Sequence, residues 1–216
     1  MIRVAPSILS ADFLHLSQDV ELVNRHGDLF HLDVMDGTFV PNISFGFPVV
    51  EALARQAQKP MDVHLMIVHP EKYVERFADA GASLLSFHYE AARERSGEII
   101  DRIHAKGVQA GMALNPDCPV NVLFPYLGKL DFVLIMCVFA GFGGQPFIPE
   151  SLERIRRVRK ELDRLGRHHV PVEVDGGIGP ENAGTVAAAG AEILVAGSSV
   201  FKATDPAAAI AALRRV

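Results

Sequence analysis

Short apolar runs typical of β-strands alternate along the chain with longer segments in which apolar residues recur at helical spacing. The eight predicted strands cover Val4–Leu9, Leu29–Val34, Met61–Met66, Leu84–His88, Gln109–Leu114, Phe132–Val138, Val172–Asp175 and Ile193–Ala196. The predicted helices cover Leu14–Arg25, Pro48–Gln56, Pro70–Ala80, Ser96–Lys106, Val120–Tyr126, Pro149–Leu165, Pro180–Ala189 and Pro206–Arg214. Several helices begin at proline and are followed by glycine, as helix ends favour.

The strand and helix pairs repeat about every 25 residues, which is typical of a closed (β/α)8 barrel, or TIM barrel, of the α/β class. A doubly wound open sheet is the alternative. No low-complexity tract or Pro/Ser-rich linker divides the chain, so residues 1–216 are predicted to form a single barrel domain. The length of 216 residues and the 49% of hydrophobic residues are sufficient for one large core.

The charge and the apolar pattern exclude several classes of partner. With 26 acidic and 21 basic residues, the formal net charge of -5 argues against a nucleic-acid-binding surface. No apolar stretch reaches about 18 residues, so no membrane span is predicted. The two cysteines suggest no disulfide framework, and the N-terminal residues enter a strand without a leader pattern. A cytoplasmic protein is therefore expected.

Polar residues interrupt several predicted strands where each strand ends. His31, Asp33 and Met35 share one face of their strand because strand side chains alternate. His64 and Asp175 end two other strands, and barrel active sites form at the C-terminal ends of strands. His88 also ends a strand, but a hydrogen-bonded core residue is the favoured interpretation for it. Asp36 is interpreted as a turn residue beside Gly37.

Two histidines and two aspartates at strand ends form a candidate site for a divalent cation. His31, Asp33, His64 and Asp175 offer the mixed nitrogen and oxygen donors that suit Zn²⁺, Fe²⁺, Mn²⁺ or Co²⁺. Spacing alone does not choose among these metals. A single histidine on an apolar strand is usually structural, so the prediction depends on the set of four.

The two aspartates also suggest acid and base chemistry. Asp33 and Asp175 are expected to face one another across the barrel, where one carboxylate removes a proton and the other donates one to the opposite face of the same carbon. That reaction is an epimerisation. The alternative is that both aspartates are only metal ligands. Met35, Met66 and Met136 are candidates for an apolar shell around the site, although core packing explains them nearly as well.

Three glycine-bearing loops follow the last three predicted strands. They contain Gly141-Phe142-Gly143-Gly144-Gln145, Gly176-Gly177 and Gly197-Ser198-Ser199. In barrel enzymes, loops at these positions bind phosphate through backbone N–H groups, and glycine permits the close approach. The hydroxyl groups of Ser198 and Ser199 are further candidate donors. Tight turns are the structural alternative, but three such loops together favour phosphate binding.

These residues lie in motifs that resemble the ribulose-phosphate 3-epimerase family over nearly the whole chain. The motifs are Ala5-Pro-Ser-Ile-Leu-Ser-Ala-Asp-Phe13, His31-Leu-Asp-Val-Met-Asp-Gly37, Phe39-Val-Pro-Asn42, Asp62-Val-His-Leu-Met66, Phe87-His-Tyr-Glu-Ala91, Asn115-Pro116, Gly141-Phe-Gly-Gly-Gln145 and Glu173-Val-Asp-Gly-Gly-Ile178.

The resemblance implies a barrel of the ribulose-phosphate-binding type that reversibly converts D-ribulose 5-phosphate to D-xylulose 5-phosphate through an enediolate. It implies that one divalent metal ion is bound by His31, Asp33, His64 and Asp175, with Asp33 as proton acceptor and Asp175 as donor. A homo-oligomer is also expected. The implied substrate-binding residues are Ser7, His64, Gly141, Phe142, Gly143, Gly144, Asp175, Gly176, Gly177, Gly197 and Ser198.

The chain departs from the family pattern at Phe139-Ala140, where the family usually has proline before Gly141 and commonly a polar residue before that proline. The loss of proline predicts a less rigid or differently shaped loop. A D-allulose 6-phosphate 3-epimerase is therefore an alternative to the pentulose enzyme. The alternative that is not an enzyme is a barrel that binds a sugar phosphate without catalytic activity.

Overall fold

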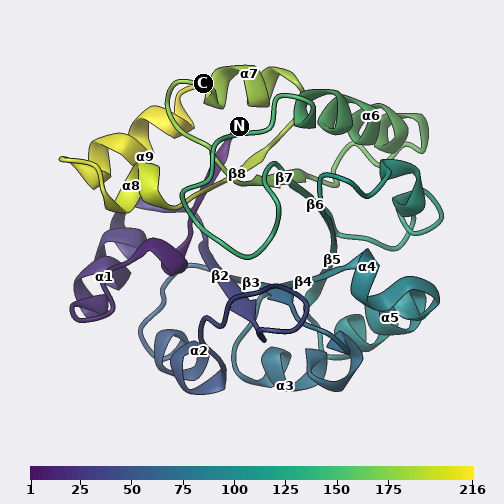
Figure 1. The fold of residues 1–216 in the computed structure, drawn as a ribbon, viewed down its shortest axis with the longest axis horizontal. Helices are drawn as coiled ribbons and strands as arrows, with labels where there is room; N and C mark the ends of the chain where they lie inside the picture. The colour runs from purple at the N-terminus through teal and green to yellow at the C-terminus, as the bar shows by residue number, and fades with distance from the viewer.

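The computed structural model describes residues 1–216 and confirms the predicted TIM barrel (Figure 1). All observed strand pairs are parallel, in the order β1-β8-β7-β6-β5-β4-β3-β2. The strands are β1 Arg3–Pro6, β2 Phe30–Met35, β3 Met61–Met66, β4 Leu84–His88, β5 Gln109–Leu114, β6 Phe132–Met136, β7 Val172–Asp175 and β8 Ile193–Ala196.

Helices surround the strands as an outer ring (Figure 1). The α-helices are α1 Leu16–His26, α2 Phe47–Ala54, α3 Val74–Asp79, α4 Tyr89–Ala92, α5 Ser96–Ala105, α6 Ser151–Arg164, α7 Ala183–Ala188, α8 Ser198–Phe201 and α9 Pro206–Arg214. Four 3-10 turns, η1 Ile8–Ser10, η2 Pro70–Lys72, η3 Arg93–Arg95 and η4 Val120–Leu123, lie in the connections. None of the helices has the length and apolar character needed to span a membrane.

Many predicted boundaries differ from the observed ones by up to three residues, and the differences at three elements have a clear physical cause. The strand expected over Val4–Leu9 ends at Pro6, and Ile8 packs into the core from η1, because an apolar run alone cannot distinguish a buried turn from a strand. The helix expected over Pro70–Ala80 is divided at Tyr73, whose φ of -126° is not helical. The segment expected as a helix over Val120–Tyr126 forms the 3-10 turn η4.

The barrel closes between β1 and β2 through a single bridge, Ser7 to His31, rather than a full ladder. Beside this seam, β2 and β3 pair so that His31 lies opposite Asp62 and Asp33 lies opposite His64. Polar side chains from neighbouring strands are thereby brought to the same levels inside the barrel.

The core has an outer part between strands and helices and an inner part within the barrel. Fifty buried apolar residues form the outer cluster. Inside the barrel, a smaller apolar layer consists of Ala5, Leu29, Leu84, Phe132, Ile193 and Val195. Near this layer, the strands β2, β3 and β7 place His31, Asp62 and Glu173 in the interior, all fully buried. The inside of the barrel is therefore partly ionisable.

Leu134 on β6 packs with Ala113, Met136 and Val138 and is completely buried, whereas Leu14 is 89% exposed. We expect Leu134→Ala to lower the free energy of unfolding by about 2–5 kcal/mol, because it removes buried apolar atoms and leaves a cavity. The same substitution at Leu14 is expected to change it by less than about 0.5 kcal/mol. Urea unfolding of both variants measures the difference, and equal changes would contradict this description of the core.

Candidate active site

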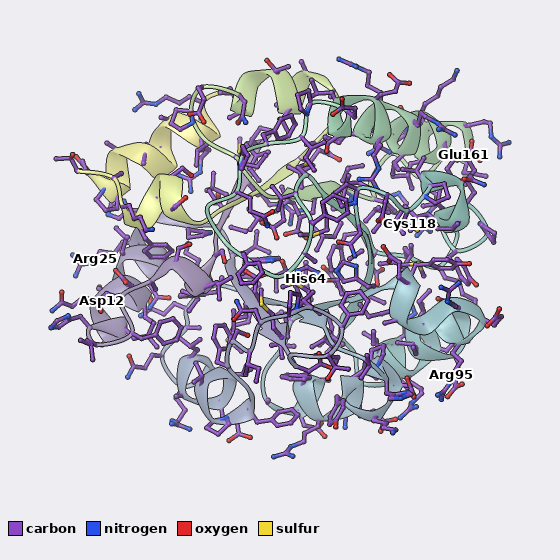
Figure 2. The ribbon with its side chains drawn as sticks, viewed as in Figure 1. Asp12, Arg25, His64, Arg95, Cys118 and Glu161 are labelled. Atoms are coloured by element: carbon purple, nitrogen blue, oxygen red, sulfur yellow. The ribbon has the colours of Figure 1, made fainter.

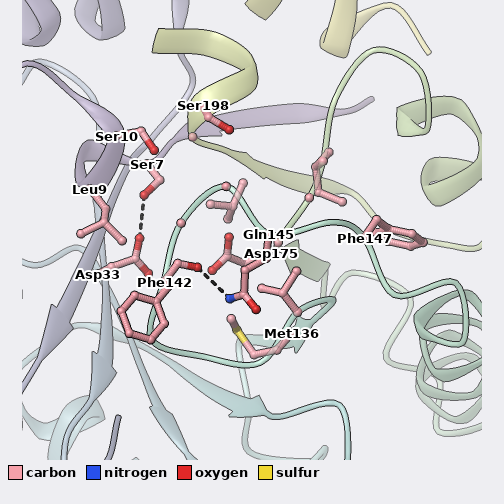
Figure 3. A pocket seen from close by; sticks show the side chains of 18 of the residues that line it. Ser7, Leu9, Ser10, Asp33, Met136, Phe142, Gln145, Phe147, Asp175 and Ser198 are labelled. Atoms are coloured by element: carbon pink, nitrogen blue, oxygen red, sulfur yellow. Dashed lines mark hydrogen bonds between the residues drawn. The ribbon is translucent and has the colours of Figure 1, made fainter. Parts of the chain in front are cut away.

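A cavity of about 470 Å³ opens at the C-terminal ends of the strands. Asp33 and Asp175 line it together with Ser7 and Met136, and the loops after β6, β7 and β8 form the remaining wall (Figure 3). The side chains of Asp33 and Asp175 extend into the same space from β2 and β7 (Figure 3). The position agrees with the general placement of active sites in TIM barrels.

The four predicted metal ligands converge at the floor of this cavity. One ligand atom from each of His31, Asp33, His64 and Asp175 lies within 4.8 Å of the others. The Oδ1 atom of Asp33 is 3.3 Å from Nε2 of His31 and 3.2 Å from Nδ1 of His64. Its Oδ2 atom accepts a 2.6 Å hydrogen bond from the Ser7 hydroxyl (Figure 3). His64 lies at the centre of the barrel (Figure 2).

A second layer of ionisable groups contacts His31 on the side away from the cavity. Its Nδ1 atom lies 2.6 Å from Oδ2 of Asp62 and 3.5 Å from Oε1 of Glu173, and all three side chains are fully buried. Neither carboxyl group was among the site residues predicted from the sequence. A signal was present, because Asp62 precedes His64 by two residues and Glu173 precedes Asp175 by two, so each shares the inward face of its strand.

The surroundings shift the pKa values of the two cavity aspartates in opposite directions. Burial favours the neutral form of Asp33, but the neighbouring positive charge of His31 holds its pKa well below the usual value. Burial, together with the negative charge of Asp33, raises the pKa of Asp175 to about 7. In the metal-free protein at neutral pH, Asp33 is therefore ionised and Asp175 is partly protonated.

The buried neighbours also have unusual proton affinities. Burial acts to lower the pKa of His31, but the carboxylates of Asp33 and Asp62 raise it well above the usual value. Burial lowers the pKa of His64 to about 4. Burial, reinforced by the charge of Asp62, raises the pKa of Glu173 well above its usual range. A proton on His31 thus partly balances the carboxylates in the metal-free protein.

The donor set fits a divalent cation. The buried Nε2 atom of His31 faces the cluster and has no hydrogen-bond partner. A hydrogen bond from Nδ1 of His31 to Asp62 would leave Nε2 available as a ligand, which is a common arrangement at metal-binding histidines. Two imidazoles and two carboxylates are donors that Zn²⁺, Fe²⁺, Mn²⁺ and Co²⁺ accept. These residues therefore provide a candidate metal centre.

The three predicted methionines line the cavity, whereas Asp36 lies outside it. Met35, Met66 and Met136 are buried and line the cavity next to the aspartates. Asp36 lies outside the cavity lining, and its carboxylate accepts hydrogen bonds from the N–H groups of Thr38, Phe39 and Val68. Asp36 is therefore a turn residue, as its sequence position beside Gly37 suggested.

The predicted glycine loops all line the cavity, and Gly176, Gly177 and Gly197 have no room for a side chain. Gly177 has a φ of +64°, and a Cβ atom there would lie 2.4 Å from the backbone nitrogen of Phe147. A Cβ atom on Gly197 would lie 2.5 Å from Oγ of Ser10. The Ser199 hydroxyl donates to the carbonyl oxygen of Ile178, so it is already used, unlike the free donor expected from sequence.

Three side-chain amides hold the loop after β6, where Phe139-Ala140 departs from the family pattern. The N–H group of Ala140 donates to Oδ1 of Asn115, and Asn42 donates to the carbonyl oxygen of Gly141. Gln145 donates to the carbonyl oxygen of Phe139. It also donates to the carbonyl oxygen of Phe142 (Figure 3). A proline at position 140 has no N–H group and could not form the bond to Asn115.

Most of the predicted site residues lie on the cavity surface, and two lie beneath it. The exceptions are His31 and His64, whose rings are fully buried and contribute nothing to the lining. The residues on the surface are Ser7, Asp33, Met35, Met66, Met136, Gly141, Phe142, Gly143, Gly144, Asp175, Gly176, Gly177, Gly197 and Ser198. The cavity lining also includes Ser10, Glu181 and Asn182, which were not predicted from the sequence as site residues.

Known structures share this architecture at low sequence identity. KGPDC from Streptococcus mutans superimposes with a TM-score of 0.75 and 13% identity, covering 100% of this chain and 96% of the other. The 3-hexulose-6-phosphate synthase from Salmonella typhimurium gives a TM-score of 0.72 and 15% identity, covering 99% and 97%. These similarities support the fold alone.

Curated relatives are much closer in sequence. A ribulose-phosphate 3-epimerase from Bacillus subtilis is 47% identical, with 99% of each chain covered. One from Synechocystis is 49% identical, covering 99% of this chain and 93% of the relative, and the cytoplasmic isoform from Oryza sativa is 43% identical with the same coverage. Residues 3–201 match the model of the ribulose-phosphate 3 epimerase family. The chain therefore belongs to the ribulose-phosphate 3 epimerase family.

Proposed function

We propose that the protein is a metal-dependent epimerase that reversibly converts D-ribulose 5-phosphate to D-xylulose 5-phosphate. The observation that carries this proposal is the pair Asp33 and Asp175, which enter one cavity from two strands with pKa values shifted in opposite directions. Curated relatives named ribulose-phosphate 3-epimerase, 43% to 49% identical over nearly the whole chain, support the substrate.

His31, Asp33, His64 and Asp175 are the residues that would hold the cation, as Zn²⁺, Fe²⁺, Mn²⁺ or Co²⁺. When bound, a divalent cation supplies positive charge that stabilises the negative charge developing on substrate oxygens. The two oxygen atoms of the Asp33 carboxyl group can serve different purposes, one holding the cation and the other accepting a proton. Its Oδ1 faces the two histidines, while Oδ2, next to Ser7, is available for the proton.

The two aspartates move the protons. The ionised Asp33 accepts the proton from C3 of the sugar, and the electron pair of the broken C–H bond passes into the adjacent carbonyl group to give an enediolate. The carboxyl group of Asp175 then donates its proton to the opposite face of C3. One turnover leaves Asp33 protonated and Asp175 ionised, so exchange with solvent or the reverse reaction restores the starting state.

The neighbouring side chains bind the sugar and limit the access of water. Ser7 lies beside Asp33 at the cavity wall, where its hydroxyl can contact the substrate. Met35, Met66 and Met136 place apolar surface next to the reacting carbon, which restricts competing proton donors. The ring of His64 lies below the cavity surface, so His64 would hold the cation rather than touch the substrate.

The loops after β6, β7 and β8 would bind the phosphate group. Their members are Gly141, Phe142, Gly143, Gly144, Gly176, Gly177, Gly197 and Ser198. Backbone N–H groups at close-packed glycines can approach phosphate oxygens directly, as in other barrel enzymes. Recognition of this kind needs no lysine or arginine, which agrees with the absence of both residue types from the cavity lining.

The affinity for a divalent cation is expected to depend on pH. A cation binds the deprotonated forms of Asp175 and His31, both of which have raised pKa values in the metal-free protein. Raising the pH from about 6 to about 8 should therefore strengthen Co²⁺ binding, by up to about tenfold per pH unit for each proton displaced. Titration against a chromophoric chelator measures this. Asp175→Asn should show weaker binding and a shallower pH dependence, and pH-independent binding would contradict the assignment.

Epimerisation should introduce solvent hydrogen at C3. Metal-loaded protein incubated with D-ribulose 5-phosphate in deuterated water should form D-xylulose 5-phosphate carrying deuterium at C3, observed by NMR. Asp175→Asn should retain substrate binding but lower kcat by about 10²–10⁴-fold, because the proton donor is lost. If wild type and variant bind the sugar phosphate equally and neither forms product, the chain is a binding protein. Faster turnover of D-allulose 6-phosphate in a parallel assay would favour the hexulose enzyme.

The phosphate loops are tested by adding one methyl group. Gly177→Ala introduces a Cβ atom at a φ of +64° and within 2.4 Å of backbone in the loop after β6, so the two loops must separate. We expect kcat/KM for D-ribulose 5-phosphate to fall by about 10²-fold, chiefly through KM. Gly128→Ala is the matched control, because a methyl group added there would have no atom within 4 Å. Equal kinetics for the two variants would contradict a role for Gly177 in phosphate binding.

A further inference from the structure

A row of buried polar groups extends from the candidate metal centre away from the cavity. The Nδ1 atom of His64 faces Asp33, and its Nε2 atom lies 3.0 Å from Nε2 of His88. On the far side of the His88 ring, Nδ1 lies 3.5 Å from Oε2 of Glu90. Both of these last atoms are buried, and neither has a hydrogen-bond partner of its own in the structure.

The hydrogen positions along this row are constrained by Glu90. Its Oε1 atom accepts a 2.7 Å hydrogen bond from the N–H group of Asn115, so its carboxylate is oriented with Oε2 toward His88. An ionised carboxylate can only accept hydrogen bonds, so these two buried atoms can satisfy one another only when Nδ1 of His88 carries a hydrogen. In neutral His88, Nε2 is then the acceptor, and the hydrogen in the contact between the two rings must belong to Nε2 of His64.

That arrangement leaves Nδ1 of His64 without a hydrogen, 3.2 Å from a carboxylate oxygen of Asp33. Two acceptor atoms that face one another repel unless a positive charge lies between them. A cation held by both atoms removes this repulsion, and the hydrogen on Nε2 of His64 remains bonded to His88. The orientation of one metal ligand would thus be set by two residues outside the ligand set.

We propose that His88 and Glu90 are positioning residues that keep the hydrogen of His64 on Nε2 and direct its Nδ1 lone pair toward the cation. The inference rests on the metal-dependent function proposed above. The local fold holds both residues in place. His88 ends β4, Glu90 follows at the start of α4, and the ring of Phe39 packs against the His88 ring with centroids 4.7 Å apart.

Glu90→Gln is the sharpest test, because it keeps the shape of the side chain and reverses one hydrogen bond. The carboxamide oxygen is expected to keep the bond from Asn115, so its NH₂ group faces Nδ1 of His88. The hydrogen of His88 then moves to Nε2, and His64 is driven to carry its hydrogen on Nδ1, the ligand atom. We expect Co²⁺ affinity to fall about 10–100-fold.

The matched control is Glu94→Gln, which removes the same charge from an exposed position four residues further along the chain. It should leave Co²⁺ affinity unchanged. His88→Gln is a second variant, because its carboxamide oxygen can accept the hydrogen bond from Nε2 of His64. Its loss of affinity should be smaller than that of Glu90→Gln. Thermal melting of the metal-free proteins tests whether each variant is folded.

A direct readout is the protonated nitrogen of His88 in the Zn²⁺-loaded wild-type protein, assigned by ¹H–¹⁵N NMR. A hydrogen on Nδ1 supports the proposal, and a hydrogen on Nε2 overturns it, whether or not any variant folds. Equal Co²⁺ affinities for Glu90→Gln, Glu94→Gln and wild type would also overturn it, while leaving the proposed function intact. A wild-type chain that bound no Co²⁺ would instead contradict the metal site of the proposed function.

Discussion

Carboxyl groups buried inside a barrel of parallel strands are the constraint on which this structure depends. Asp33, Asp62 and Glu173 are removed from solvent, and each unpaired charge in such a place would cost several kcal/mol. The protein limits this cost by placing His31 between Asp33 and Asp62 and by keeping a proton on Glu173. A divalent cation would balance the remaining negative charge, so metal binding is expected to contribute to the stability of the folded state.

The regular pleat of the strands places these groups at two levels. On β2, His31 and Asp33 both point inward, and on β3 Asp62 and His64 do the same at matching register positions. The lower level contains His31 and Asp62, and it supports the upper level, which contains Asp33 and His64. The upper level is the one nearer the substrate cavity. The lower level adjoins the apolar inner layer, because Asp62 pairs with Leu84 and Glu173 pairs with Ile193 in the strand register. Of these groups, only Asp33 and Asp175, at the upper level, line the cavity.

The barrel was predictable from sequence because its strands and helices differ in hydrophobic period and alternate regularly. The convergence of His31, Asp33, His64 and Asp175 was also predictable, since strand ends meet at one face of a barrel. The contact between His64 and His88 was not, because it depends on the ring orientations of two neighbouring strands. The bond from Ala140 to Asn115 likewise joins loops after different strands, and no local pattern encodes it.

Asp33 and Asp175 are chemically identical side chains, but the pKa of Asp33 is lowered and that of Asp175 is raised. Their neighbours explain the difference. The positive charge of His31, whose Nε2 atom lies 3.3 Å from Oδ1 of Asp33, stabilises the ionised form of Asp33. Burial and the negative charge of Asp33 are the largest influences on Asp175, and both favour its neutral form. The asymmetry that an epimerase needs in its starting state, one base and one acid, therefore arises because the charge of His31 outweighs burial at Asp33 but not at Asp175.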